Sequence, residues 1–172
     1  MSNPKTLTGC EKVSTMFREM RRKKQALSDA ETIEILQTST SGVLAVSGDD
    51  GYPYAVPVSH VYHEGKLFIH GAVAGHKIDG IRRNEKVSFC VIAQDNLMPE
   101  KRATDYRSAV VFGRARIVEG AAEKRLALDR IADKLAPGFE AEARQDTERL
   151  WDETCVVEIT IEHMTGKAAM QY

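Results

Sequence analysis

The ten residues FIHGAVAGHK, numbered 68–77, decide the fold that this sequence predicts. They begin as an apolar strand, continue through the small residues 71–75 and enter a segment, 76–83, in which Ile78 and Ile81 have helical spacing. Backbone amides at the start of a helix attract anions, glycine lets a ligand approach the backbone closely, and Lys77 adds a positive charge. The stretch therefore predicts a phosphate-binding turn between a strand and a helix. A simple connecting loop with a surface lysine would show the same local pattern.

On both sides of this stretch the sequence predicts short strands, because runs of β-branched and aromatic residues alternate with turn residues. The predicted strands are 43–46, 52–62, 66–70, 87–92, 108–118 and 156–161. Turns at 49–51 and 64–65 would join the first three strands in a meander. Pro53 and Pro57 cannot donate ladder hydrogen bonds, which predicts a kinked or edge strand, and Gly113 predicts a bulge.

Helices are predicted around these strands. Ser28 and Glu31 have the spacing of a capping box, so a helix is expected to start at Asp29. Apolar residues at helical spacing from 128 to 135 predict a second helix that ends before Pro137 and Gly138, and a further helix follows at 140–150. With the six strands, this predicts an α+β, mainly β, six-stranded barrel. A single domain at 28–172 would follow an N-terminal arm at 1–27.

Composition is that of an ordinary globular protein. The chain has 172 residues, a formal net charge of −1 and 42% hydrophobic residues, so one domain with no global attraction to nucleic acid or an acidic membrane is expected. No apolar run approaches the roughly 20 residues that cross a bilayer. The first ten residues lack a secretory pattern and the 3 cysteines are scattered, which predicts a cytoplasmic protein. The basic cluster at 21–24 is expected to be a solvated arm against a partner subunit.

Five motifs appear in a fixed order along most of the chain: RRK at 21–23, GYPYAVPV at 51–58, GKLFIHGA at 65–72, GHK at 75–77 and YRSAVVFGRA at 106–115. In this order and spacing they resemble the pyridoxamine 5'-phosphate oxidase-like superfamily. Within it, they are most similar to the flavin-nucleotide-binding branch that includes nitroimidazole-resistance proteins. The resemblance covers about residues 20–167.

The resemblance implies a split β-barrel that binds FMN in a groove between the two subunits of a homodimer. It implies that Lys77 holds the phosphate, with His76 beside it in the same turn. The residues implied around the flavin ring are Pro57, Val58, Ser59, His60, Ile69, His70, Gly71, Ala72 and Ser108.

His70 matches the histidine that nitroimidazole-resistance proteins place near the flavin, and it is the candidate catalytic residue. An imidazole with an ordinary pKa near 6.5 can donate a hydrogen bond or a proton to a small-molecule acceptor. A histidine with a purely structural bond at the strand end is the alternative. The chain ends MTGKAAMQY, unlike the Arg-x-Leu ending of true pyridoxamine phosphate oxidases, so oxidation of that vitamin is not expected.

Other constellations carry weaker predictions. His60 and His63 have H-x-x-H spacing, but positions three apart on a strand point to opposite faces, so no metal site is expected. Cys90 and Cys155 fit buried small side chains, and Trp151 would either cover the flavin or fill the core. Two functions stay open: an FMN-dependent oxidoreductase that uses reduced nicotinamide and reduces a small acceptor such as a nitroaromatic, and a non-catalytic flavin- or haem-binding carrier or sensor.

Overall fold

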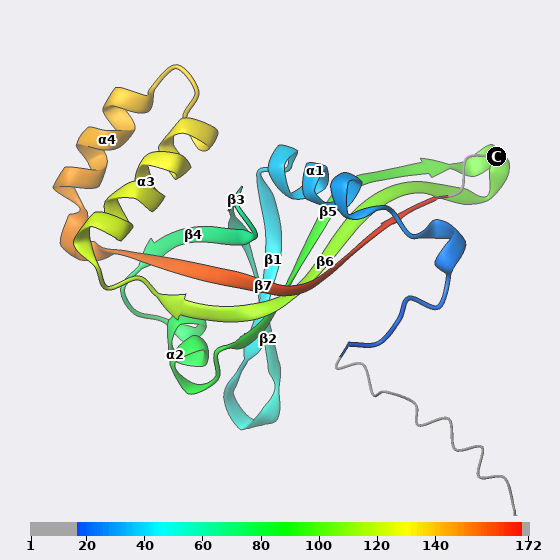
Figure 1. Ribbon diagram of the computed structural model, residues 1–172, viewed down its shortest axis with the longest axis horizontal. Helices are drawn as coiled ribbons and strands as arrows, with labels where there is room; N and C mark the ends of the chain where they lie inside the picture. Colours follow the sequence, from blue (N-terminus) through cyan, green and yellow to red (C-terminus); the bar gives the residue numbers. More distant parts are fainter. Residues whose placement is uncertain (1–16, 170–172) are drawn as a thin grey trace, which may run out of the picture.

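A computed structural model describes residues 17–169 of the chain. Within them, seven strands form one antiparallel sheet in the order β2-β1-β5-β6-β7-β4-β3, with four α-helices on its outside (Figure 1). The strands are β1 (Ser41–Ser47), β2 (Pro53–Ser59), β3 (Val61–His63), β4 (Lys66–Ala72), β5 (Lys86–Met98), β6 (Ala103–Ile117) and β7 (Thr154–Ala168). The helices are α1 (Asp29–Thr38), α2 (His76–Arg83), α3 (Ala121–Leu135) and α4 (Glu140–Arg149).

The sheet curls on itself. Strands β2 and β3 lie at opposite ends of the sheet order, yet only His60 separates them in the chain. The two ends must therefore approach one another, and the sheet encloses its inward side chains as a barrel does. The main core fills this interior, with Leu44, Leu67, Phe89, Val111 and Ile159 among its fully buried members.

The strand expected at 52–62 is two strands, so the barrel has seven strands rather than six. β2 pairs only with β1, whereas β3 pairs with β4, and the expected three-strand meander is therefore wrong. The break lies at His60, whose amide donates to Thr40 O at 3.1 Å and whose ring is completely buried. The expected edge position of Pro53 and Pro57 is confirmed, because β2 ends the sheet.

The predicted helix starts are confirmed where a local signal marks them. Ser28 and Glu31 form the capping box: the Ser28 amide donates to Glu31 Oε2 at 2.8 Å, and the Glu31 amide donates back to Ser28 Oγ at 3.3 Å. Helix α2 has the predicted bounds, and α4 ends one residue before the predicted end. The bulge expected at Gly113 is confirmed, because the β6–β7 register shifts between Phe112 and Gly113, where a Cβ would collide with Thr160 O.

Helices α3 and α4 cover only one part of the barrel's outer surface. They pack over β4 and β7, where Phe68, Val156, Leu128 and Ile131 belong to a second, smaller core (Figure 1). Trp151 packs against this core, with Lys124 Nζ 4.3 Å from its ring centroid. No helix in the described part of the chain is long and apolar enough to cross a membrane.

Strands β5 and β6 are longer than expected and project from the barrel as a two-stranded arm (Figure 1). Residues 17–27 run beside the end of β7, where Ala26 forms an isolated bridge with Lys167. The basic side chains at 21–24 are exposed there. The remainder of the expected N-terminal arm, residues 1–16, lies outside the described residues, as does the end of the chain at 170–172.

Candidate functional site

The predicted phosphate-binding turn has the required backbone geometry. Strand β4 ends at Ala72, and Gly75 precedes α2 with a φ of +126°, a conformation that glycine adopts without strain. The Gly75 carbonyl accepts the amides of Ile78 at 2.9 Å and Asp79 at 3.0 Å. No side chain in the described residues caps this helix end, so the amides of the first two helical positions face outward from the helix start.

Lys77 returns from the helix start to the end of β4. A Cβ built on Gly71 would lie 3.1 Å from Lys77 Nζ and 3.2 Å from Lys77 Cε. The ammonium thus occupies space that any residue other than glycine would partly fill. The structure brings together a fixed positive charge, a glycine and free helix amides, which is a suitable arrangement for a phosphate.

The neighbouring Cys155 lies near three cations, but its thiol is not activated. Cys155 pairs with Gly71 across the β4–β7 ladder. Lys77, Arg82 and Lys124 are close enough to favour its thiolate, but burial outweighs them and raises the pKa of the Cys155 thiol. Burial also raises the pKa of Cys90. Both are therefore expected to stay protonated and unreactive at neutral pH.

His70 points away from the barrel interior. Its neighbour Ile69 is 1% exposed inside the core, while the His70 side chain lies on the outer face beneath α3 and α4 and stays accessible to solvent. Partial burial, and then the Lys77 cation, lower the pKa of His70 from its ordinary 6.5. The imidazole is therefore neutral at neutral pH, with one nitrogen that donates and one that accepts.

His76 ties the phosphate-binding turn to the β1–β2 hairpin. Its ring stacks on Tyr54 of β2 with centroids 4.0 Å apart, and its Nε2 lies 3.5 Å from Asp49 Oδ2. Arg83, at the other end of α2, donates to Asp49 Oδ1 at 2.6 Å. These contacts hold the start of α2 against β2, so the candidate residues on β2 and those on β4 belong to one region.

Pro57, Ser59 and Ser108 share the outer face of the sheet that none of the described helices covers. The register places Pro57 beside Val43, Val43 beside Cys90, and Cys90 beside Val110 in one row across four strands. A second row runs through Ala55, Ala45, Ser88 and Phe112. We call the residues of these two rows, with Ser59, Ile92 and Ser108, the open face. It is largely apolar, and Val43, Phe112 and Ile92 are 37%, 40% and 66% exposed.

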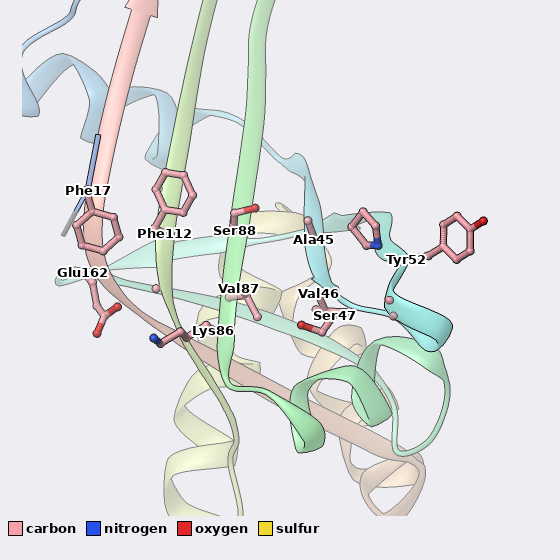
Figure 2. A pocket seen from close by; sticks show the side chains of 14 residues that line it. Phe17, Ala45, Val46, Ser47, Tyr52, Lys86, Val87, Ser88, Phe112 and Glu162 are labelled. Carbon is pink, nitrogen blue, oxygen red and sulfur yellow. The ribbon is translucent and has the colours of Figure 1, made fainter. Parts of the chain in front are cut away.

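A cavity of about 600 Å³ lies on this face. Figure 2 shows Ala45 on β1 and Ser88 on β5 at its floor, with Lys86 and Glu162 near one edge. The Phe17 ring borders it beside Phe112 (Figure 2). This ring also stacks on His163, with centroids 4.7 Å apart. None of these lining residues was expected to contact a ligand, and their only signal in the sequence is the alternation along the strands.

Three of the expected ligand-contacting side chains point elsewhere. Ile69 and His60 are 1% and 0% exposed, and Val58 packs against the main core. His60 Nε2 lies 3.0 Å from Leu36 O, and burial, then Lys134, lower the pKa of His60 to about 4. These three side chains pack in the barrel interior, contrary to the expectation that they contact the ligand, because the inward positions of a closed barrel are filled by its core.

The histidine pair of the H-x-x-H motif does not converge. His60 lies in the core, while His63 Nε2 lies 2.9 Å from Arg130 Nη2 outside it. Among residues 17–169, no cluster of three His, Cys, Asp or Glu side chains is arranged to hold a metal ion.

Comparison with known proteins agrees with this fold. The family model described as pyridoxamine 5'-phosphate oxidase matches residues 28–168. A candidate 5-nitroimidazole antibiotic resistance protein from Bacteroides thetaiotaomicron superimposes with a TM-score of 0.67 at 23% identity, over 83% of this chain and 85% of that one. No curated protein sequence is significantly similar.

Two further solved structures are similar. A FAD-binding protein from Mesorhizobium loti is 26% identical, with a TM-score of 0.64 over 85% of this chain and 98% of that one. The FAD and heme binding protein from Mycobacterium smegmatis is 24% identical, with a TM-score of 0.74 over 87% and 75%. The expected α+β split-barrel fold is confirmed.

Proposed function

The chain belongs to the pyridoxamine 5'-phosphate oxidase family, and on that premise we propose that it is an FMN-dependent oxidoreductase working as a homodimer. The observation that carries the proposal is the position of Lys77. Its ammonium lies over Gly71, next to the outward amides of α2, and this arrangement complements the dianionic phosphate at the end of FMN. The residues present fit the cofactor, because Gly71 leaves room for the ammonium near the free amides at the start of α2.

Bound FMN would supply the redox chemistry, taking a hydride from reduced nicotinamide and passing electrons to a small acceptor. The chain's own residues bind and orient. Lys77 and the amides of residues 76 and 77 hold the phosphate, and the backbone around Gly71 and Ala72 flanks the ring. Pro57, Ser59 and Ser108 approach the ring from the open face.

His70 is proposed as the residue that delivers a proton to the reduced acceptor. The imidazolium form would donate the proton and become the neutral imidazole, the form that partial burial and the Lys77 cation favour. After donation the imidazole would recover a proton from solvent, to which the side chain remains accessible.

A second copy of the chain is proposed to cover the open face. The two rows of outward side chains are mostly apolar, and α3 and α4 lie on another part of the barrel. A contiguous apolar surface of this kind is typical of an interface. Pairing would also enclose the cavity at Ala45 and Ser88.

A nitroaromatic acceptor is supported by the similarity to the 5-nitroimidazole resistance candidate. A non-catalytic flavin or haem carrier is the second candidate function, and the similar proteins that bind FAD, or FAD and heme, favour it. An oxidoreductase would reduce an acceptor catalytically, whereas a carrier would bind its cofactor without turnover.

Oxidation of NADH by the purified protein with added FMN separates them. We expect a nitroaromatic acceptor to raise the rate at least tenfold above free FMN at the same concentration, with Lys77→Ala lowering it at subsaturating FMN. If the protein retains FMN and no acceptor in the panel raises the rate above free FMN, the oxidoreductase proposal is wrong and the carrier function stands.

A further inference from the structure

A cavity of about 250 Å³ lies between α3, α4 and the ends of β4 and β7. His70 and Thr154 border it on the sheet side, and Leu128, Ile131 and Leu135 of α3 form an apolar wall. Engineered apolar cavities of about 150 Å³ hold benzene. This one is therefore large enough for a single substituted ring.

The cavity exists because α4 presents small side chains to α3. Ala143 and Thr147, four residues apart on α4, border the cavity, and no residue of α4 is buried. Ion pairs at the sides of the helices hold the pair together instead: Arg144 bonds to Asp129 at 3.3 Å and also to Asp133, and Arg125 bonds to Glu148. Small side chains on α4 thus leave a cavity beside the α3 residues Leu128 and Ile131, which are themselves almost fully buried.

The polar groups around the cavity suit an uncharged ligand. The Thr147 and Thr154 hydroxyls donate to Ala143 O at 3.0 Å and to Leu150 O at 2.8 Å, so their protons are already used. The carboxylate of Asp146 lies on the rim. Together with a neutral His70, this leaves no cation lining the cavity to neutralise an anionic ligand.

We propose that this cavity binds a small, uncharged, largely apolar ring compound, whose polar substituent hydrogen-bonds to His70. The identification of that compound with the electron acceptor rests on the proposed function, since His70 is the residue proposed to protonate the acceptor. The binding itself does not depend on flavin. Specificity for the acceptor would then lie in the α3–α4 pair rather than in the barrel.

Benzamide and benzoate form a matched pair of probes, equal in shape and different in charge. Isothermal titration calorimetry of the full chain as purified should show saturable benzamide binding at least tenfold tighter than benzoate. Ala143→Leu, which fills the cavity, should weaken benzamide binding at least tenfold. Ala141→Leu, on the exposed side of the same helix, should change the affinity for benzamide less than twofold. His70→Leu should weaken benzamide binding although it keeps the size of the cavity.

No saturable binding of benzamide, equal affinity for benzoate, or unchanged affinity in Ala143→Leu would each overturn the proposal. Circular dichroism of the variants separates misfolding from a filled cavity. Flavin content is measured on the same preparations. A chain that retains no flavin but binds benzamide with these preferences contradicts the proposed function and supports the cavity, whereas the converse result contradicts the cavity alone.

Discussion

The Lys77 ammonium lies so close to Gly71 that a Cβ there would fall 3.1 Å from Nζ. Gly71, at the end of β4, thus lies directly beside the charged end of Lys77, in the first turn of α2. The five residues 72–76 connect them, and the first four, Ala72 to Gly75, are small or apolar.

Lys77→Ala should weaken FMN binding about 10- to 100-fold, because a hydrogen bond to a charged group contributes roughly 1.5–3 kcal/mol. Titration of FMN fluorescence at constant ionic strength measures this. Lys101→Ala removes an exposed lysine at the tip of the β5–β6 arm and should leave the affinity unchanged. Equal losses in both variants would mean that net charge, not this position, binds the phosphate.

Gly71→Ala should also weaken FMN binding, but by a smaller factor, because its methyl group displaces only the flexible end of Lys77 and no backbone atom. Folding should be little affected. Since the two substitutions act on the same ammonium, Gly71→Ala should add little in a Lys77→Ala background. Full additivity of the two losses in a double-mutant cycle would show that Gly71 contributes separately.

How much the sequence predicts depends on whether the signal is local. The capping box, the bounds of α2 and the bulge at Gly113 were predictable, since neighbouring residues in the chain determine them. The break at His60 was not, because it depends on Thr40 and Leu36, far away in sequence. Two consecutive buried residues, His60 and Val61, interrupt the period-two alternation, but polarity alone gives no sign of that.

His60 should make the fold sensitive to acid. Its folded pKa of about 4 lies below the ordinary 6.5, so the folded state favours the neutral ring. The resulting stability is complete above pH 6.5 and is lost as the pH falls from 6.5 towards 4. At pH 5 this group alone should cost about 2 kcal/mol.

Urea unfolding at pH 7.5 and pH 5 measures that loss. His60→Gln keeps a nitrogen that can donate to Leu36 O but does not titrate. The drop between the two pH values should therefore be about 2 kcal/mol smaller in the variant. The same drop in both proteins would assign the acid sensitivity to other groups.

Val110→Glu should separate the proposed dimer into monomers, because it places a charge on the open face, at the β6 end of the row that contains Val43 and Cys90. Size-exclusion chromatography with light scattering measures the mass. Leu126→Glu, at a 51% exposed position on α3, is the matched control and should remain dimeric. A monomeric wild-type chain would refute the dimer directly.

His70→Gln should lower the rate of acceptor reduction while FMN stays bound, because the variant side chain does not donate a proton. In the wild type, the pH profile of kcat should show an inflection below 6.5, the ordinary value from which burial and Lys77 lower this pKa. The inflection should vanish in the variant. Its persistence there would assign the proton transfer to another group.

The residues around the candidate site also divide into those that the local sequence indicates and those that depend on contacts between distant segments. Lys77, Gly71 and His70 were predictable from one continuous segment and its resemblance. Ile69, His60 and Val58 were not, since whether a strand residue faces the core depends on the closure of the barrel. The cavity beneath α4 depends on how two helices pack and has no sequence signal beyond Ala143 and Thr147.

The visible absorbance spectrum of the purified full-length chain, with mass analysis of the small molecule released on denaturation, tests the central claim most directly. Flavin bands with FMN released, and their loss in Lys77→Ala but not in Lys101→Ala, are the predicted result. A Soret band, released FAD in place of FMN, or no chromophore even after FMN is added would contradict it.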